Sequence, residues 1–272
     1  GPGLSTFNNL GFNNAGQIVI DQGRLSLQGI DGNLTGSANI AIGEIAQPGT
    51  FKIFCSNPSN VKNVLDEVIV PVASTARTMA DLKGKRVGSG PGIQNVTLAK
   101  TILERGGATG ATVVELPIGQ HVAALAAGQI DAVYTLEPTG TIGRMNGTTR
   151  VLEPGVIAKY VLGDPMAPWF GGSASLASAF IQKNPDVAKK FIAAYGKGVT
   201  YVRTKPAEAR QYMKGYTAIE GPLTGEVPLA AYTMYNEFTP ADVAHFQKFF
   251  DLFSEKGIFS KRLMVDSMLY KG

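Results

Sequence analysis

Apolar and polar positions alternate along the chain in a way that predicts short strands followed by helices. From Val96 to Leu103, apolar side chains recur at helical spacing while charged residues fall on the opposite face. The segment GKRV upstream is typical of a strand, and the pair Gly106-Gly107 is typical of a helix end. The pattern therefore predicts a strand, a glycine-rich loop and a helix in succession.

Two further segments share one order of features. VAALAAGQIDAVYTLEPTG (Val122 to Gly140) predicts a helix that Gly128 ends, then a strand with two apolar faces, as found in parallel sheets between helices. LSLQGIDGNLTGSANIAIGEI (Leu25 to Ile45) has the same order: a helix-like lead, Gly, Ile-Asp, an apolar stretch and a later Glu. Two similar α/β halves predict two lobes. The loop Glu137-Pro138-Thr139 should face a ligand crevice, because open α/β sheets bind ligands at the carboxyl ends of strands.

Two extended segments are suited to connect the lobes. VLDEVIVPVAS (Val64 to Ser74) is rich in β-branched residues and predicts the outgoing crossing, and Trp169 to Phe180 predicts the return crossing. The predicted division is lobe 1 over 1–74 and 169–272, shortened near 31–36, with lobe 2 over 75–168 inserted into it.

The C-terminal third predicts helix after helix. Four segments begin near Pro, Asp or Thr, as helices do: 184–204, 206–217, 229–238 and 239–258. In the last of these, four phenylalanines recur at helical spacing, and we interpret them as core packing: Phe246, Phe249, Phe250 and Phe253.

Composition narrows the function. The 272 residues suit two domains of ordinary size, with 44% hydrophobic residues, 33 Gly and 15 Pro. The net charge of +4 is scattered, so nucleic-acid binding is not supported. Cys55 is the only cysteine and is expected in a buried strand, while His121 and His245 are expected at the surface or as helix caps. The residues therefore predict no enzyme centre, no metal site and no cofactor.

The glycine loop leaves three alternatives open. Gly88, Gly90 and Gly92 depart from the dinucleotide pattern G-x-G-x-x-G, and no Walker lysine follows. Glu115, at the end of the next predicted strand, favours a nucleotide because a ribose-binding acid lies about there. A structural turn is the second alternative. The third, which the rest of the chain favours, is a small polar or anionic ligand held by backbone N–H groups at the helix start.

At this point the sequence resembles the periplasmic substrate-binding proteins of ABC importers, of the nitrate/sulfonate/taurine-binding (NMT1/THI5-like) type. The resemblance rests on four segments in the family's order, and it extends from about Gly36 to the end: MADLKGKRVGSGPG, LAAGQIDAVYTLEP, FIQKNPDVAKKFIAAY and FDLFSEKGIFSKRLMVDSMLY. It implies a type II periplasmic-binding-protein-like α/β fold, in which two lobes are joined by two hinge crossings and enclose a ligand cleft.

The N-terminal part departs from the family pattern. Asn13 to Asp31 resembles the family's first helix and the strand entry that follows it. Asp31 then runs almost at once into GNLTGSANIAIGEI, so the strand and helix that usually separate these parts are missing.

The resemblance implies a receptor that closes on a small solute and is read by an ABC permease in the inner membrane. By the family's layout, one group of solute contacts comes from lobe 1, a second from lobe 2 and one from the return crossing. The expected ligand-binding residues are Asn13, Asn14, Ser37, Ala38, Asn39, Ser56 and Asn57, then Ser89, Gly90, Gln94, Asn95, Glu137 and Thr139, and finally Trp169.

Several of these residues have structural alternatives. Asn13 and Asn14 are also suited to cap a helix, and Asn57 before Pro58 to form a turn. Glu137 is also suited to bond backbone rather than solute, and Trp169 to pack under the hinge.

The polar set favours an organic anion such as a sulfonate or carboxylate, and leaves open a neutral pyrimidine, a thiamine precursor, stacked on Trp169. The other rivals are a pyrimidine-synthesising enzyme on this fold and the effector-binding part of a transcription regulator. The expected protein is a monomer, periplasmic or lipid-anchored outside the cytoplasm. The opening Gly-Pro is typical of a cleaved tag, so the lack of a signal peptide says little about export.

Overall fold

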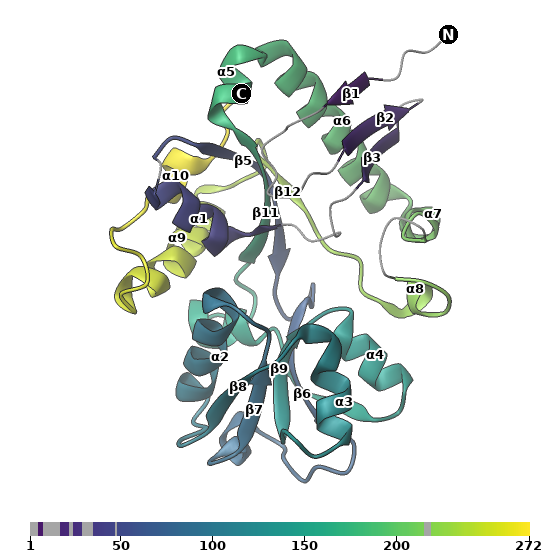
Figure 1. Cartoon of the computed structure of the whole chain (residues 1–272), viewed down its shortest axis with the longest axis vertical. Helices are drawn as coiled ribbons and strands as arrows, with labels where there is room; N and C mark the ends of the chain where they lie inside the picture. The colour runs from purple at the N-terminus through teal and green to yellow at the C-terminus, as the bar shows by residue number, and fades with distance from the viewer. Residues whose placement is uncertain (1–4, 8–16, 22–23, 29–34, 47, 215–218) are drawn as a thin grey trace.

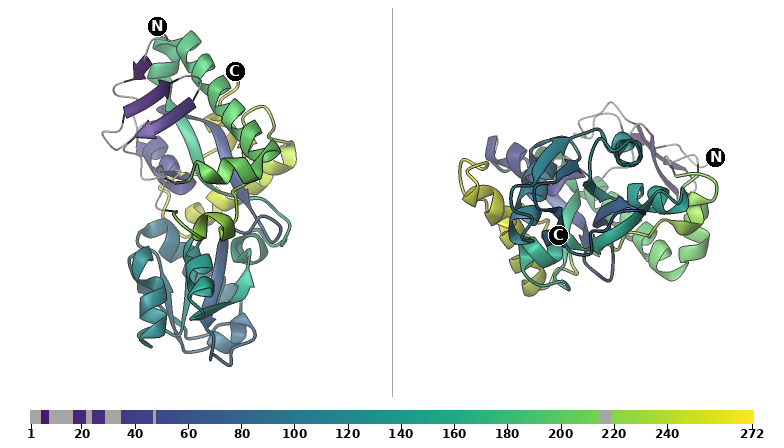
Figure 2. Two further views of the ribbon diagram at one scale, coloured as in Figure 1. Left: turned by 90° about the vertical axis from the view of Figure 1, so that its right-hand side faces the viewer. Right: turned by 90° about the horizontal axis from the view of Figure 1, so that it is seen from below.

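The protein consists of two lobes stacked along its long axis, each built on its own sheet (Figures 1 and 2). The computed structural model describes residues 5–7, 17–21, 24–28, 35–46, 48–214 and 219–272. The predicted mixed α/β, two-lobed architecture is confirmed.

Lobe 1 is built on a four-stranded antiparallel sheet. In spatial order the strands are β12 (Thr233–Met234), β5 (Phe51–Ser59), β11 (Trp169–Ala177) and β4 (Thr35–Gly36). Apolar residues of β5 and β11 pack against α6 (Pro185–Thr204) on one face, while α1 (Ser37–Ala46) and α9 (Pro240–Glu255) cover the other. The remaining helices of this lobe are α5 (Ser178–Lys183), α7 (Pro206–Gln211), α8 (Leu223–Glu226) and α10 (Val265–Met268).

Lobe 2 is built on a mixed five-stranded sheet. In spatial order the strands are β10 (Thr149–Pro154), β6 (Asp66–Pro71), β9 (Ala132–Leu136), β7 (Arg86–Ser89) and β8 (Thr112–Glu115). β7 pairs in parallel with β8 and β9, whereas β6 runs antiparallel to β9 and β10. The strand β9, expected in a parallel sheet, therefore has one parallel and one antiparallel neighbour. The helices are α2 (Ile93–Arg105), α3 (His121–Ala126) and α4 (Thr139–Met145), with 3₁₀ turns at Met79–Leu82 and Ile118–Gln120 and a π-helical turn at Ala158–Leu162.

The helix predicted after the glycine loop is confirmed as α2. Ala99 and Ile102 are fully buried, and Lys100 and Glu104 lie exposed on the opposite face. The chain turns out of the helix at Gly107, whose φ of 80° is a left-handed conformation that glycine adopts without strain.

Two of the helix predictions are wrong. Within the segment from Asn13 to Asp31, the described residues form the strands β2 (Gln17–Asp21) and β3 (Arg24–Gln28), which pair with β1 (Ser5–Phe7) in a separate antiparallel sheet. Consecutive β-branched residues in QIVID favour a strand. In the segment 229–238, β12 pairs with the edge of β5 instead, so sheet pairing overrides the helical spacing.

Of the other C-terminal helices, α6 and α9 match the prediction closely. Thr239 begins α9 with a capping box: its side chain accepts from the N–H of Asp242, and the Asp242 carboxylate accepts from the N–H of Thr239 at 2.9 Å. The phenylalanine stripe of α9 is fully buried, which confirms its predicted role in the core.

The outgoing and return chains run side by side between the lobes. β5 ends at Ser59 and β6 begins at Asp66, so the crossing lies at 60–65, earlier than the segment 64–74, because β6 is a strand of the lobe 2 sheet. Asn60 donates its side-chain N–H to the carbonyl of Met166 at 3.0 Å, which ties this crossing to the return chain.

A fully buried carboxylate braces the crossing. Asp66 accepts from the Ser59 hydroxyl at 2.6 Å and from the Ile157 N–H at 2.9 Å. Burial raises the pKa of Asp66, and these hydrogen bonds oppose that rise because they favour the charged form.

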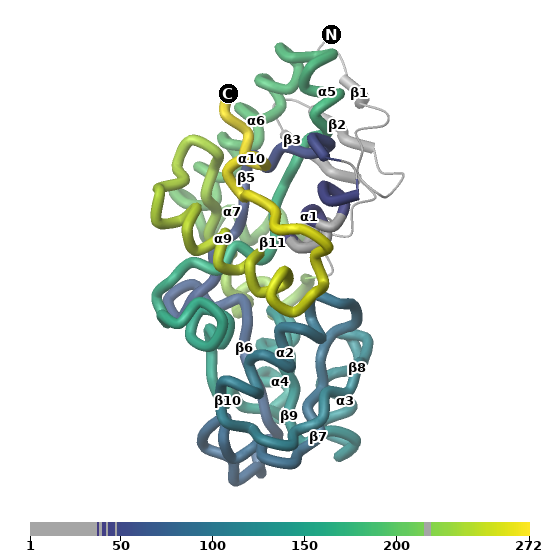
Figure 3. The backbone as a smooth tube through the Cα atoms, turned by 90° about the vertical axis from the view of Figure 1, so that its left-hand side faces the viewer, coloured from purple at the N-terminus to yellow at the C-terminus, as the bar shows by residue number. Residues whose placement is uncertain are grey.

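One hydrophobic core extends through both lobes. It contains Ile53 and the α9 phenylalanines of lobe 1 together with Val68 and Val87 of lobe 2. Figure 3 shows the C-terminal segment running along lobe 1 down to its border with lobe 2. Packing as well as the two crossings therefore connects the lobes.

Candidate functional site

The loops after β7 and β9 lie at the edge of the lobe 2 sheet that faces lobe 1. Leu136, the last residue of β9, pairs with Asp66, the first residue of β6, and so lies beside the crossing. Because β7 runs parallel to β9, its carboxyl end lies at the same edge. Gly90, Asn95 and Leu136 line one small hollow there. Both loops were expected to contact a solute, and the structure brings them to one edge of the sheet.

The glycine loop is held by bonds within lobe 2. Gly92, with a φ of 92°, donates its N–H to the carboxylate of Glu115 at 2.7 Å. The side chain of Asn95 donates to the carbonyl of Pro91 at 3.0 Å, and the hydroxyl of the buried Ser89 donates to that of Gly90 at 3.1 Å. Glu115 therefore shapes the loop, which explains the acid at this position without a ribose. Gln94 lies in the first turn of α2.

His121 is buried behind this loop, so its predicted surface or capping position is wrong. Its Nε2 lies 3.2 Å from the carbonyl of Leu116, and its Nδ1 lies 3.0 Å from the hydroxyl of Thr135. Because a carbonyl only accepts, Nε2 carries the hydrogen and Nδ1 accepts from Thr135. Burial lowers the pKa of His121, which keeps the ring neutral and the tautomer fixed.

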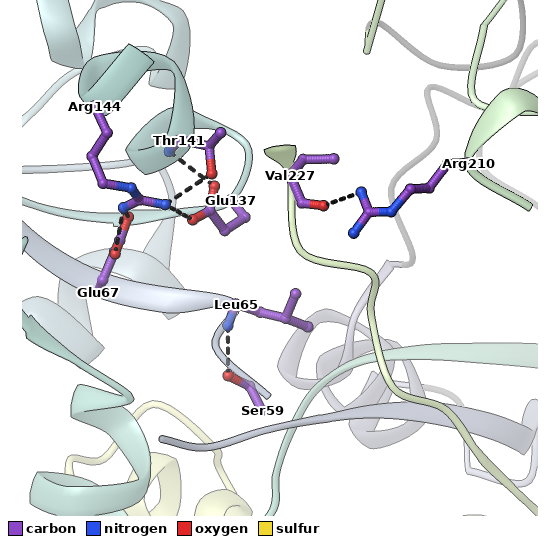
Figure 4. A network of polar contacts seen from close by, with 8 residues as sticks. All are labelled: Ser59, Leu65, Glu67, Glu137, Thr141, Arg144, Arg210 and Val227. Carbon is purple, nitrogen blue, oxygen red and sulfur yellow. Dashed lines mark hydrogen bonds and ion pairs between the residues drawn. The ribbon is translucent and has the colours of Figure 1, made fainter. Parts of the chain in front are cut away.

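The carboxylate of Glu137 is held by groups of its own lobe. Its Oε2 accepts from the N–H of Thr141 at 3.0 Å, and its Oε1 pairs with Nη2 of Arg144 at 2.7 Å (Figure 4). Nη1 of Arg144 contacts both carboxylate oxygens of Glu67, at 2.8 and 3.0 Å. Both Glu side chains are almost fully buried, at 2% and 3% exposed. Glu137 thus makes the backbone bond that the sequence analysis left open as its alternative role.

Glu67 carries a perturbed carboxyl group. Burial raises its pKa to about 7, repulsion by Glu137 adds to the rise, and Arg144 opposes it. A second buried acid, Asp66, acts in the same direction from the neighbouring position in β6.

We expect Glu67→Gln to change how stability depends on pH. The folded chain holds this proton up to about pH 7, whereas the ordinary pKa is 4.5, so the wild type loses stability as pH rises between these values. The Gln side chain keeps an acceptor for Arg144 and does not titrate. The free energy of unfolding of Glu67→Gln, taken relative to that of the wild type, should therefore rise by up to about 3 kcal/mol from pH 4.5 to pH 8.

Urea unfolding at several pH values measures this gain. Glu208→Gln is the matched control, because the bond from the Tyr201 hydroxyl lowers the pKa of the exposed Glu208. The control should shift weakly in the opposite direction. Parallel stability curves for the wild type and Glu67→Gln would contradict the prediction.

Three serines form a buried chain of hydroxyls in lobe 1. Ser56 donates to the carbonyl of Gly172 at 2.6 Å, Ser173 donates to Ser56 at 2.9 Å, and the oxygens of Ser37 and Ser173 lie 2.8 Å apart. Because the Ser173 hydroxyl donates its only hydrogen to Ser56, Ser37 must be the donor in its bond with Ser173. These hydroxyl bonds fix the start of α1 against β5 and β11, a few residues from the crossing.

The structure places the remaining candidates as follows. Ala38 and Asn39 lie in the first turn of α1, and their side chains fall outside the described part, as do Asn13 and Asn14 entirely. Asn57 is half-buried in β5, and its Oδ1 finds no hydrogen-bond partner among the described residues.

The last two candidates are both buried. Thr139 begins α4 and is 6% exposed. Trp169 is 4% exposed, and its ring packs edge-on against Phe249 with centroids 5.9 Å apart, as in its packing alternative.

The sequence matches one protein-family description over more than half of its length. The model of the NMT1/THI5 like family covers residues 59–209, from the crossing through lobe 2 to α7. The chain belongs to this family. No curated protein matches the chain.

Solved structures share the fold of this NMT1/THI5-like chain. The periplasmic aliphatic sulphonate binding protein SsuA from Escherichia coli matches with a TM-score of 0.69 at 19% identity, over 87% of this chain and 74% of that one. The alkanesulfonate-binding protein SsuA from Xanthomonas axonopodis pv. citri, bound to MOPS, has a TM-score of 0.65 at 19% identity, over 87% and 79%. The desulfurization enzyme DszB has a TM-score of 0.61 at 11% identity, over 86% and 81%.

Four residues of this candidate site were not predicted from the sequence. His121 was assigned to the surface, and Glu67, Arg144 and Ser173 were not singled out. Glu67 interrupts the apolar run of β6, and an acid within a buried strand signals a paired charge. Arg144 and Ser173 carry no comparable signal, because their partners Glu67 and Ser56 are distant in sequence.

Proposed function

We propose that this NMT1/THI5-like protein is an extracytoplasmic solute receptor. It binds a small organic anion, of the sulfonate or carboxylate class, between its lobes and delivers it to an ABC permease by hinge closure. The observation that carries the proposal is the pair of helix starts beside the crossing: α1 begins at Ser37 in lobe 1, and α2 follows the glycine loop in lobe 2. Helix N-termini favour anions through unpaired N–H groups and the helix dipole.

On the lobe 2 side of this edge, the pairing of Arg144 favours recognition through N–H groups over an ion pair. Arg144 already contacts two carboxylates, so its charge is compensated inside lobe 2. The sulfonate-binding proteins with the same fold bind anions of this chemical class. Among the described residues, no cluster of His, Cys, Asp and Glu is suited to a metal ion.

Two alternatives find less support. A pyrimidine stacked on Trp169 needs an accessible ring face, but this ring is packed against Phe249. An enzyme that uses a cysteine nucleophile needs an accessible thiolate. Cys55, the single cysteine of the sequence, is fully buried, and burial raises its pKa to about 12.

The proposed partner and location follow from the same role. The receptor acts as a monomer in the periplasm, or anchored by lipid outside the cytoplasm, and meets the permease at the membrane. In the part of the chain that the structure describes, no helix has the length and apolar character to cross a bilayer.

Thermal unfolding with a panel of solutes tests the proposal. The panel contains alkanesulfonates, taurine, nitrate, aromatic carboxylates and pyrimidines, and the matched alcohols without a sulfonate are the controls. A ligand at about 100 times its dissociation constant adds roughly 2.7 kcal/mol, or about 5–10 °C for a chain of this size. We expect such a shift with an organic anion and none with the alcohols. A shift with pyrimidines alone, or with no member of the panel, contradicts the proposal.

A further inference from the structure

Arg144 joins two acids that come from different parts of lobe 2. Glu67 lies in β6 beside the crossing, and Glu137 is the first residue after β9. Figure 4 shows the guanidinium of Arg144 between the two carboxylates, with Thr141 above Glu137. The guanidinium fixes both carboxylates at once because its two terminal nitrogens point in fixed directions.

The bond between Glu137 and Thr141 sets the path of the loop between them. Thr141 is the third residue of α4, where a backbone N–H has no partner within the helix, and it donates to Glu137 instead. The turn Glu137-Pro138-Thr139 is therefore closed by this side chain. The turn also lies where the lobes meet, because α8 of lobe 1 packs against α4, and Figure 4 shows the buried Val227 on the far side of Glu137.

The fit around these groups is close. A Cβ atom on Gly140 would lie 1.3 Å from Oε1 of Glu67, so only glycine lets the Glu67 carboxylate reach Arg144 across α4. Burying two carboxylates with one guanidinium is a poor way to gain stability, because desolvation offsets most of the attraction. A geometric role accounts for the arrangement better.

We propose that Arg144, anchored by Glu67, is a positioning residue of the solute site: it holds the Glu137 carboxylate and, through it, the turn Glu137-Pro138-Thr139 at the edge facing lobe 1. The proposal rests on the proposed solute-binding function for its effect on affinity. Its effect on the turn does not depend on any solute.

The decisive variant is the double substitution Glu67→Met with Arg144→Met. Arg144→Met alone leaves two buried carboxylates without a cation and is expected to fold poorly. The double variant replaces the pair by apolar side chains of similar length. It leaves one buried carboxylate, Glu137, without a cation instead of two, so it should fold better than Arg144→Met while removing the hold on Glu137. Arg86→Met is the matched control, because Arg86 pairs with Asp131 in the same lobe at the opposite edge of the sheet.

Two measurements are made on each variant of the full chain. The first is amide hydrogen exchange of Thr141, with Asn146 as the internal reference because its N–H bonds to Ile142 within α4. The second is the affinity for the sulfonate that stabilises the wild type most. In the double variant we expect Thr141 to exchange at least tenfold faster, Asn146 to be unchanged, and affinity to fall about tenfold. Arg86→Met should change none of these.

The proposal is overturned if Thr141 stays as protected in the double variant as in the wild type. It is also overturned if protection is lost and affinity is unchanged, because the turn then does not serve the solute. If the wild type binds no solute of the panel, the proposed function fails, and exchange at Thr141 still decides whether Arg144 positions the turn.

Discussion

Gly140→Ala should destabilise the protein by about 3–5 kcal/mol, the range found when a buried ion pair is broken. The added methyl group would lie 1.3 Å from Oε1 and 2.5 Å from Cδ of Glu67, and 3.1 Å from Nη1 of Arg144. Glu67 is almost fully buried and has no room to retreat. Because φ at Gly140 is not left-handed, the backbone accepts alanine, and the whole loss comes from the displaced ion pair. Denaturant unfolding measures the loss of stability, and solute titration measures any change in affinity.

The matched control is Gly198→Ala in the middle of α6, where an added Cβ meets nothing within 4 Å. Replacing a helical glycine by alanine stabilises by roughly 0.5–1 kcal/mol when space allows. The two variants therefore carry the same change in helices and should move in opposite directions. Equal stability of Gly140→Ala and the wild type would show that Glu67 is free to leave Arg144.

Phe249→Ala is expected to cost about 3–5 kcal/mol, as for other large aromatic residues removed from a core. Phe249 is fully buried and makes edge-on contacts with Trp169 and Phe253, at centroid distances of 5.9 and 5.3 Å. The core around it contains residues from both sheets. We therefore expect one cooperative transition, lower by about 10 °C, with both lobes unfolding together.

Differential scanning calorimetry measures the transition, and Met264→Ala is the control for apolar truncation. Met264 is 51% exposed, so its removal should change stability by less than about 0.5 kcal/mol. Two separate transitions in Phe249→Ala, with only one of them lowered, would show that the lobes have independent cores.

Local patterns in the sequence predicted much of the fold, because each pattern reports which face of an element is buried. The spacing of Val96 to Leu103 placed α2, and the phenylalanine stripe placed α9 in the core. The same reasoning failed at 229–238, where an edge strand forms only because β5 offers a partner nearby in space. The resemblance also failed from Asn13 to Asp31, which it assigned to the family's first helix and a strand entry. The strands β2 and β3 form there, and the β-branched Ile-Val-Ile run of β2 is typical of a strand.

The candidate site was predicted where its position follows from topology. The loops at Gly90 and Glu137 come together because two parallel strands end at one edge. The roles of Arg144 and Ser173 in the candidate site could not be predicted from the sequence, because they depend on contacts with Glu67 and Ser56 that span 77 and 117 residues. His121 was misplaced because its burial depends on a hydroxyl and a carbonyl on neighbouring segments.

The adjacent crossings make lobe 2 an insertion at a single point of the lobe 1 chain. Val61 donates its N–H to the carbonyl of Pro165 at 3.2 Å, so the segment enters and leaves lobe 1 at almost the same place. An insertion whose ends meet adds little to the entropy of closing the host fold. In evolutionary terms, lobe 2 forms a cassette. Recombination can exchange such a cassette as a unit, with new junctions needed only at the border between the lobes.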